Sequence, residues 1–170
     1  NVHEPMLLPH LGGAVSEDPA FLVEIRDAVA AGGRDALAVL TLAFTSPRPS
    51  AGVMGRLRVA GDVIGHRNPN QRFDLLGPGS LDSWSGARIV DDDAVVFFAL
   101  QNPLRTQVPL AAGDGDFGAI TLCLRPGARA GVYPITVESA EVVEWETDRS
   151  IRPSVAAGTL TLLRDVTSTA

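Results

Sequence analysis

The chain has 170 residues, of which 45% are hydrophobic, and a net charge of −6 with an isoelectric point near 4.9. This length fits one domain with one core, and a chain this apolar is not intrinsically disordered. The acidic balance argues against nucleic acid as a partner, because affinity for phosphate backbones needs clustered positive charge. No apolar run is long enough for a membrane span, and the single cysteine, Cys123, excludes an intramolecular disulfide.

The two ends of the chain lack the periodic patterns of its centre. Residues 1–20 contain several prolines and glycines and no sustained period, so we expect an N-terminal leader lying on the domain. Residues 167–170 are small and polar and resemble the start of a linker. The domain itself is expected over residues 21–166.

Residues 18–31 carry signals for two different structures. Asp18 as an N-cap, Pro19 at the first helical position and apolar residues four apart would form a short helix. From Phe21 to Ile25, every second residue is a large apolar one, which indicates a strand. Because strands dominate the rest of the chain, the strand is favoured and the helix is the alternative.

The remaining chain consists of short apolar runs separated by turns, and its 17 glycines and 12 prolines fall largely between these runs. This pattern is typical of a β-sandwich or barrel. Besides the segment at residues 21–31, strands are predicted at residues 36–44, 52–60, 71–76, 84–90, 94–100, 117–124, 132–138 and 159–163, with residues 142–145 extending or following the strand at 132–138. The sequence therefore predicts an all-β fold, a sandwich of about nine antiparallel strands.

Two of these strands carry further information. The run at residues 36–44 is apolar throughout, as expected for a strand in the interior of a sandwich. In residues 52–60 the pattern alternates, so Val53 and Leu57 face the core while Arg56 and Arg58 face away. A turn at residues 91–93 joins the strands at 84–90 and 94–100 into a hairpin.

Residues suited to catalysis are sparse. No serine stands in a nucleophile-elbow frame, and the three histidines, His3, His10 and His66, are far apart in the sequence. Glycosidases use paired carboxylates, for which the candidates by residue type are Glu138, Glu141, Glu144 and Glu146. Two of them, Glu144 and Glu146, alternate around Trp145 as an exposed strand face does. We predict no catalytic residue and a chain that is not an enzyme.

Metal and carbohydrate sites have equally weak signals. The acidic turns at residues 91–93 and 114–116 could offer oxygen ligands to calcium, but the EF-hand spacing is absent and aspartate and glycine also favour tight turns. We therefore predict no metal site and no cofactor. Trp84, Trp145 and Tyr133 are the aromatics that could form a sugar platform, although large aromatics in a sandwich more often belong to the core.

Residues 111–138 resemble the late strands of cohesin domains. In that family an acidic, glycine-containing turn precedes an alternating strand, matched here by DFGAI at residues 116–120, and a Gly-x-Tyr-Pro-Ile-Thr phrase opens the next strand, matched by GVYPIT at residues 131–136. GTLTL at residues 158–162 is similar to the closing strand. The resemblance covers about 140 residues, but the family's Tyr-Asp-Pro phrase is replaced by VAGD at residues 59–62.

The resemblance implies a nine-stranded jelly-roll sandwich that holds a small helical partner, the dockerin, against one sheet face in an extracellular or cell-surface protein. In cohesins the third, fifth, sixth and eighth strands form that face, here expected near residues 52–60, 71–76, 94–100 and 132–138. The outward phase then gives the predicted partner-binding residues, which are Arg56, Arg58, Arg72, Asp74 and Leu76. The alternatives are a polysaccharide-binding module of the same architecture and a structural or adhesive cell-surface domain.

Overall fold

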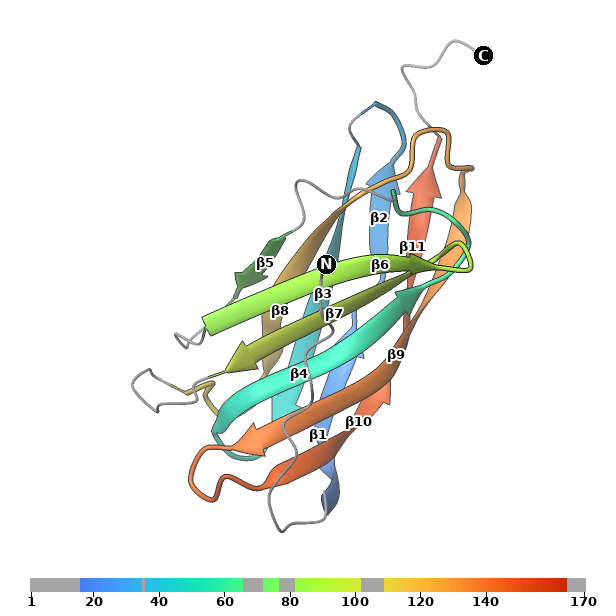
Figure 1. Ribbon diagram of the computed structural model, residues 1–170. Coiled ribbons are helices and arrows are strands. Elements are labelled where there is room, and N and C mark those ends of the chain that lie inside the picture. Colours follow the sequence, from blue (N-terminus) through green and yellow to red (C-terminus); the bar gives the residue numbers. More distant parts are fainter. Residues whose placement is uncertain (1–15, 35, 66–71, 77–81, 102–108, 165–170) are drawn as a thin grey trace.

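The computed structural model describes residues 16–34, 36–65, 72–76, 82–101 and 109–164. These residues form strands and no helix (Figure 1). The strands are β1 (Ser16–Ile25), β2 (Ala28–Ala31), β3 (Leu37–Ser46), β4 (Ser50–Val59), β5 (Arg72–Leu75), β6 (Asp82–Val90), β7 (Asp93–Gln101), β8 (Gly113–Cys123), β9 (Gly131–Glu144), β10 (Ser150–Ala156) and β11 (Gly158–Leu163). Within these ranges no helix is available to cross a membrane.

The strands pair into one path in the order β5-β8-β3-β1-β10-β9-β4-β7-β6, and β11 joins β9 to β2. The path curls, so that β6, β7, β4 and β9 lie side by side in front of β8, β3 and β1 (Figure 1). Most neighbours are antiparallel, as predicted, but β1 pairs with β10 and β2 pairs with β11 in parallel. The curl leaves β5 and β6 as the two ends of the path.

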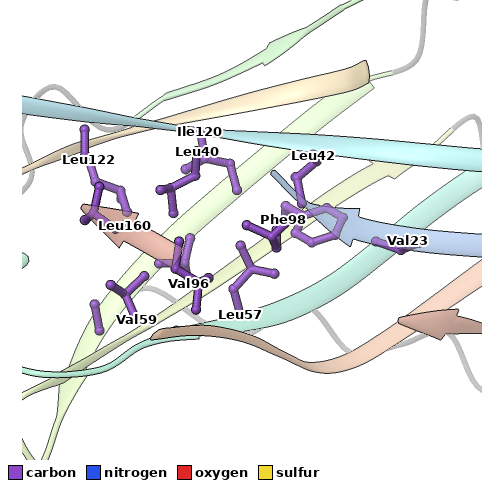
Figure 2. Packing of buried hydrophobic residues seen from close by; sticks show 14 of the residues in the cluster. Val23, Leu40, Leu42, Leu57, Val59, Val96, Phe98, Ile120, Leu122 and Leu160 are labelled. Carbon is purple, nitrogen blue, oxygen red and sulfur yellow. The ribbon is translucent and has the colours of Figure 1, made fainter. Parts of the chain in front are cut away.

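The core lies between the two facing halves of this sheet (Figure 2). Side chains from both halves meet there without any exposure, among them Leu40, Leu42, Leu57, Val59, Val96, Phe98, Ile120 and Leu122. Burying a side chain of this size stabilises the fold by about 1.5–3 kcal/mol relative to leaving it in water. The period-two pattern of each strand thus supplies one buried row to a common core.

Phe73 connects β5, at one end of the path, to strands of both halves. Its ring lies 6.1 Å from that of Phe98 on β7 and 6.5 Å from that of Phe117 on β8. The ring occupies space left by Gly118, where an added Cβ would lie 2.2 Å from Phe73 Cζ. The absence of a side chain at Gly118 therefore allows β5 to pack on β8.

Residues 18–31 form strands, so the helix alternative is wrong. Phe21, Val23 and Ile25 of β1 are at most 3% exposed, and this alternating row packs into the core. Asp18 accepts a hydrogen bond from the Ala20 amide at 3.0 Å, a local turn contact in place of a helix cap. β1 begins at Ser16, inside the segment expected as a leader, while residues 1–15 and 167–170 lie outside the described residues.

Two other details differ from the sequence prediction. In the first half of β3, one face of the apolar run is exposed, because Leu37 and Val39 are 42% and 51% exposed. β7 is instead the strand buried on both faces. In addition, β10 was not predicted, because its sequence contains Pro153 and lacks a clean alternation of apolar and polar residues.

Candidate binding surface

The strands β6, β7, β4 and β9 present a face that points away from the core. Their register sets Trp84 beside Ala99 and Ala99 beside Met54, and it places Val95 between Arg88 and Arg58. We call this surface the outer face and define it by Met54, Arg56, Arg58, Trp84, Arg88, Val95, Phe97, Ala99 and Glu138.

The middle of the outer face is apolar. Met54, Val95, Phe97 and Ala99 alternate with core residues and lie outside the core cluster, yet none is more than 4% exposed. The indole of Trp84 stacks on the Phe97 ring at a centroid distance of 5.1 Å and is itself 41% exposed. An outward sheet face is ordinarily polar, so this apolar row is unusual. Because the four side chains are already buried within the chain, Trp84 is the residue among these five that offers accessible apolar surface to a partner.

A charged cluster borders this apolar base. Arg58 Nη1 lies 3.2 Å from Asp93 Oδ2, and Arg58 Nε lies 3.3 Å from Glu138 Oε2. Arg56 Nε lies 3.6 Å from the other oxygen of Glu138. The hydrogen bonds to Asp93 and then to Glu138 raise the pKa of Arg58 above its ordinary value. These pairs are partly exposed and add little stability, but they orient both guanidinium groups.

Glu138 reaches both arginines because β9 bulges at this point. Arg56 pairs with Ser139 and the next residue, Leu57, pairs with Val137, so Glu138 is the extra residue of the bulge. A bulge inserts one unpaired residue and redirects its side chain. The irregular register therefore creates the acidic contact that links Arg56 to Arg58.

The β6–β7 hairpin carries Trp84 to the outer face, and its prediction is confirmed. Asp91 and Asp92 have φ values of 50° and 68°, the left-handed pair of a two-residue hairpin turn that aspartate tolerates. Asp93, directly after the turn, accepts a hydrogen bond from the Gly61 amide at 3.0 Å. The acidic run thus forms the turn and fastens it to the end of β4.

Of the predicted partner-binding residues, the structure brings only Arg56 and Arg58 together on this face. β5 pairs with β8, so Arg72 and Asp74 lie beside each other on the opposite half of the sheet, with 2.9 Å between Arg72 Nε and Asp74 Oδ2. Leu76, just after β5, lines a small hollow of about 110 Å³. The strand that shares this face with β7, β4 and β9 is β6, and not residues 71–76 as the resemblance implied.

Several residues of the outer face were missed from the sequence. Trp84 was available, because the predicted hairpin already placed its strand next to residues 94–100. Glu138, and Asp93 at the border of this face, had no such signal in the sequence. The role of Glu138 depends on a bulge, and that of Asp93 depends on a contact with Arg58 from another strand.

Three of the four carboxylates considered for glycoside hydrolysis, Glu138, Glu141 and Glu144, have structural partners among the described residues. The Ser150 hydroxyl donates to Glu141, and Glu144 accepts from Arg48 Nη2 at 2.6 Å and from Thr147 Oγ1 at 2.8 Å. Glu144 is only 4% exposed, so the prediction that it lies on an exposed face is wrong. Burial alone would raise the pKa of Glu144, but the hydrogen bonds from Thr147 and Arg48 outweigh it and the pKa lies below its ordinary value. A lowered pKa suits an ion pair and not a general acid.

The described residues hold no metal site, and two of the three aromatics considered for a sugar platform, Trp84 and Tyr133, pack on neighbouring residues. No group of three His, Cys, Asp or Glu side chains is placed to hold a metal ion in the part of the chain that the structure describes. One face of the Trp84 indole is covered by Phe97, and Tyr133 packs against Gly61 while its hydroxyl donates to the Arg129 carbonyl. The three histidines considered as ligands lie outside the described residues.

Comparison with known sequences gives no match, either to a protein-family model or to a curated protein. Solved structures do match. A cohesin in the complex of OlpC with a dockerin from Clostridium thermocellum has a TM-score of 0.57 at 14% identity, over 89% of this chain and 99% of that one. The third cohesin of ScaC from Acetivibrio cellulolyticus, in complex with the ScaB dockerin, has a TM-score of 0.59 at 14% identity, over 84% and 99%.

A third similar structure is a cohesin module from a family 33 glycoside hydrolase of Clostridium perfringens, with a TM-score of 0.57 at 8% identity, over 86% and 99%. In all three, nearly the whole cohesin module is matched. The resemblance noted in residues 111–138 is thus confirmed by structural comparison, and the chain has the fold of cohesin modules.

Proposed function

We propose that this chain is a non-catalytic protein-binding module that holds a dockerin-type partner on its outer face. Two of the similar structures are cohesins in complex with dockerins. In this proposal the curled sheet is the family's nine-stranded jelly-roll sandwich, with β2 and β10 as additional short strands, and the protein works outside the cell or on its surface.

The observation that carries the proposal is the composition of the outer face. Stable protein interfaces bury an apolar centre inside a polar rim, and a few aromatic or arginine residues supply most of the affinity. Here Trp84 stands on the apolar base, and Arg56 and Arg58 are held at its border by Glu138. Trp84 is therefore expected to be the main anchor of the partner.

Partner binding by Arg72, Asp74 and Leu76 remains a prediction. These residues lie on the β5–β8 half of the sheet and not on the outer face. If they bound the same partner as Arg56 and Arg58, that partner would have to reach both halves of the sheet. Variants on each surface therefore show whether the partner binds the outer face, the β5–β8 surface or both.

The test measures affinity, by calorimetry, for dockerin modules encoded in the same genome. Trp84→Ala should weaken binding by about 30-fold, the loss typical of an interface anchor. Arg72→Ala, on the other half of the sheet, should leave affinity unchanged if the partner binds the outer face alone. If Arg72→Ala costs as much as Trp84→Ala, the partner binds the β5–β8 surface. Failure of the wild-type protein to bind any dockerin would overturn the proposed function.

A further inference from the structure

An open hollow lies at the end of the domain where β2 and β11 finish and β9 begins. Its volume is about 660 Å³, and its lining comes from the turn after β2, the connection from β8 to β9 and the end of β11. These segments meet at the top of Figure 1, and the Gly32 amide donates to the Leu163 carbonyl at 3.0 Å to join two of them. The hollow shares no residue with the outer face.

The floor of the hollow is apolar and one of its walls is a tight turn. Leu124 and Leu162 are 6% and 2% exposed and belong to the core cluster. The turn from Arg125 to Ala128 is closed by a hydrogen bond from the Ala128 amide to the Arg125 carbonyl at 3.1 Å, and Gly127 has the φ of 78° that such a turn needs. Small residues in this wall keep the hollow open.

Three arginines from three separate segments line the hollow, namely Arg34, Arg125 and Arg164, and no aspartate or glutamate is among its described lining residues. This concentration of positive charge contrasts with the net charge of −6 of the whole chain. It marks the hollow as a place where an anion would be favoured.

The three arginines differ in how they are held. Arg125 Nε donates to the Asp62 carbonyl at 2.8 Å and lies 3.3 Å from Asp62 Oδ1, so its charge is partly balanced by that carboxylate, and Arg125 Nη1 donates to the Pro126 carbonyl at 3.3 Å. These contacts orient the guanidinium. Its Nη2 has no partner within the described part of the chain. Arg34 and Arg164 are exposed and form no hydrogen bond or ion pair with any residue that the structure describes. Donor groups thus remain available on all three side chains.

We propose that this hollow binds a small organic anion carrying two or more carboxylates. A guanidinium group presents paired N–H donors that match the two oxygens of a carboxylate, and three such groups suit more than one carboxylate. The volume falls within the range of small-molecule sites, and the leucine floor favours an organic body over a bare inorganic ion. This inference is independent of the function proposed for the outer face.

The test uses citrate as the probe and the ¹⁵N-labelled full chain. Saturable shifts of the backbone amides of Gly33, Gly127 and Ala128 are expected, with a dissociation constant of about 1 mM for a ligand of this size. The double variant Arg34→Gln, Arg164→Gln should weaken binding by about tenfold or more. Arg152→Gln is the matched control, because Arg152 is exposed on β10 and, within the described ranges, pairs only with Glu17. This variant should bind as the wild type does.

Three results would overturn the proposal. One is the absence of saturable shifts, as expected if Arg34 and Arg164 are neutralised by Asp35 and Asp165, their neighbours in the sequence. Another is an equal response to sulfate at the same ionic strength, which would show only unspecific screening. The last is an equal loss of affinity in the double variant and in the Arg152→Gln control.

Discussion

Replacing Gly118 with alanine tests whether the fit of Phe73 fixes β5 on β8. The new Cβ would lie 2.2 Å from Phe73 Cζ and 2.8 Å from Phe73 Cε1, well inside contact distance. The ring has little freedom to move aside, because Phe98 and Phe117 flank it. Overpacking of this kind costs about 1–3 kcal/mol, and alanine recovers about 0.5–1 kcal/mol relative to glycine in a strand. We expect a net destabilisation of about 1 kcal/mol.

The same substitution should change sign when the ring is absent. Phe73→Ala alone is expected to cost about 2 kcal/mol, less than the 3–5 kcal/mol of a fully buried phenylalanine, because Phe73 is only half-buried. The three atoms nearest to a Cβ at Gly118 all belong to Phe73. In the Phe73→Ala background, Gly118→Ala should therefore stabilise the protein by about 0.5–1 kcal/mol. Urea unfolding followed by tryptophan fluorescence gives these free energies, provided that the m-value is unchanged.

Two results would refute this reasoning. Equal destabilisation by Gly118→Ala in both backgrounds would show that the cost arises in the β8 backbone and not at the ring. A neutral effect in the wild type would show that β5 moves away easily, so that the ring does not determine the placement of β5 and of Arg72.

Other expected outcomes concern the ion pair, the stacked aromatics and the core. Because hydrogen bonds from the protein lower the pKa of Glu144, its charge stabilises the fold above the ordinary glutamate range, and this stability is lost as the pH falls through the lowered pKa. The stability difference between the wild type and Glu144→Gln should thus shrink from pH 7 to pH 3 in urea titrations, and a constant difference would contradict the assigned ion pair. Trp84→Leu should cost about 0.5–1.5 kcal/mol through the lost stacking on Phe97, and an unchanged unfolding midpoint would argue against that contact. Leu57→Ala should cost about 2–5 kcal/mol in the same assay, since Leu57 is fully buried, and a loss below 1 kcal/mol would mean that the core collapses around it.

The acidic hairpin and the alternating strands could be read from the sequence because both are local properties. The turn needs two residues that tolerate left-handed backbone, and aspartate supplies them at residues 91 and 92. The core phase of β4 follows from the alternation of Val53, Leu57 and Val59 with Met54, Arg56 and Arg58, and the first three are fully buried. The burial of Glu144 could not be read in this way, because its partner Arg48 comes from a distant turn.

The sequence by itself determined that this chain is dominated by β-strands, which residues of β4 face the core, and that Arg56 and Arg58 point outward side by side. Only the tertiary structure decided which strands are neighbours. The placement of β5 on β8 depends on a glycine fitting under a ring 45 residues away, and the reach of Glu138 depends on a bulge against β4. Period-two patterns specify the face of a strand but not its partner, because pairing is chosen by long-range packing between distant segments.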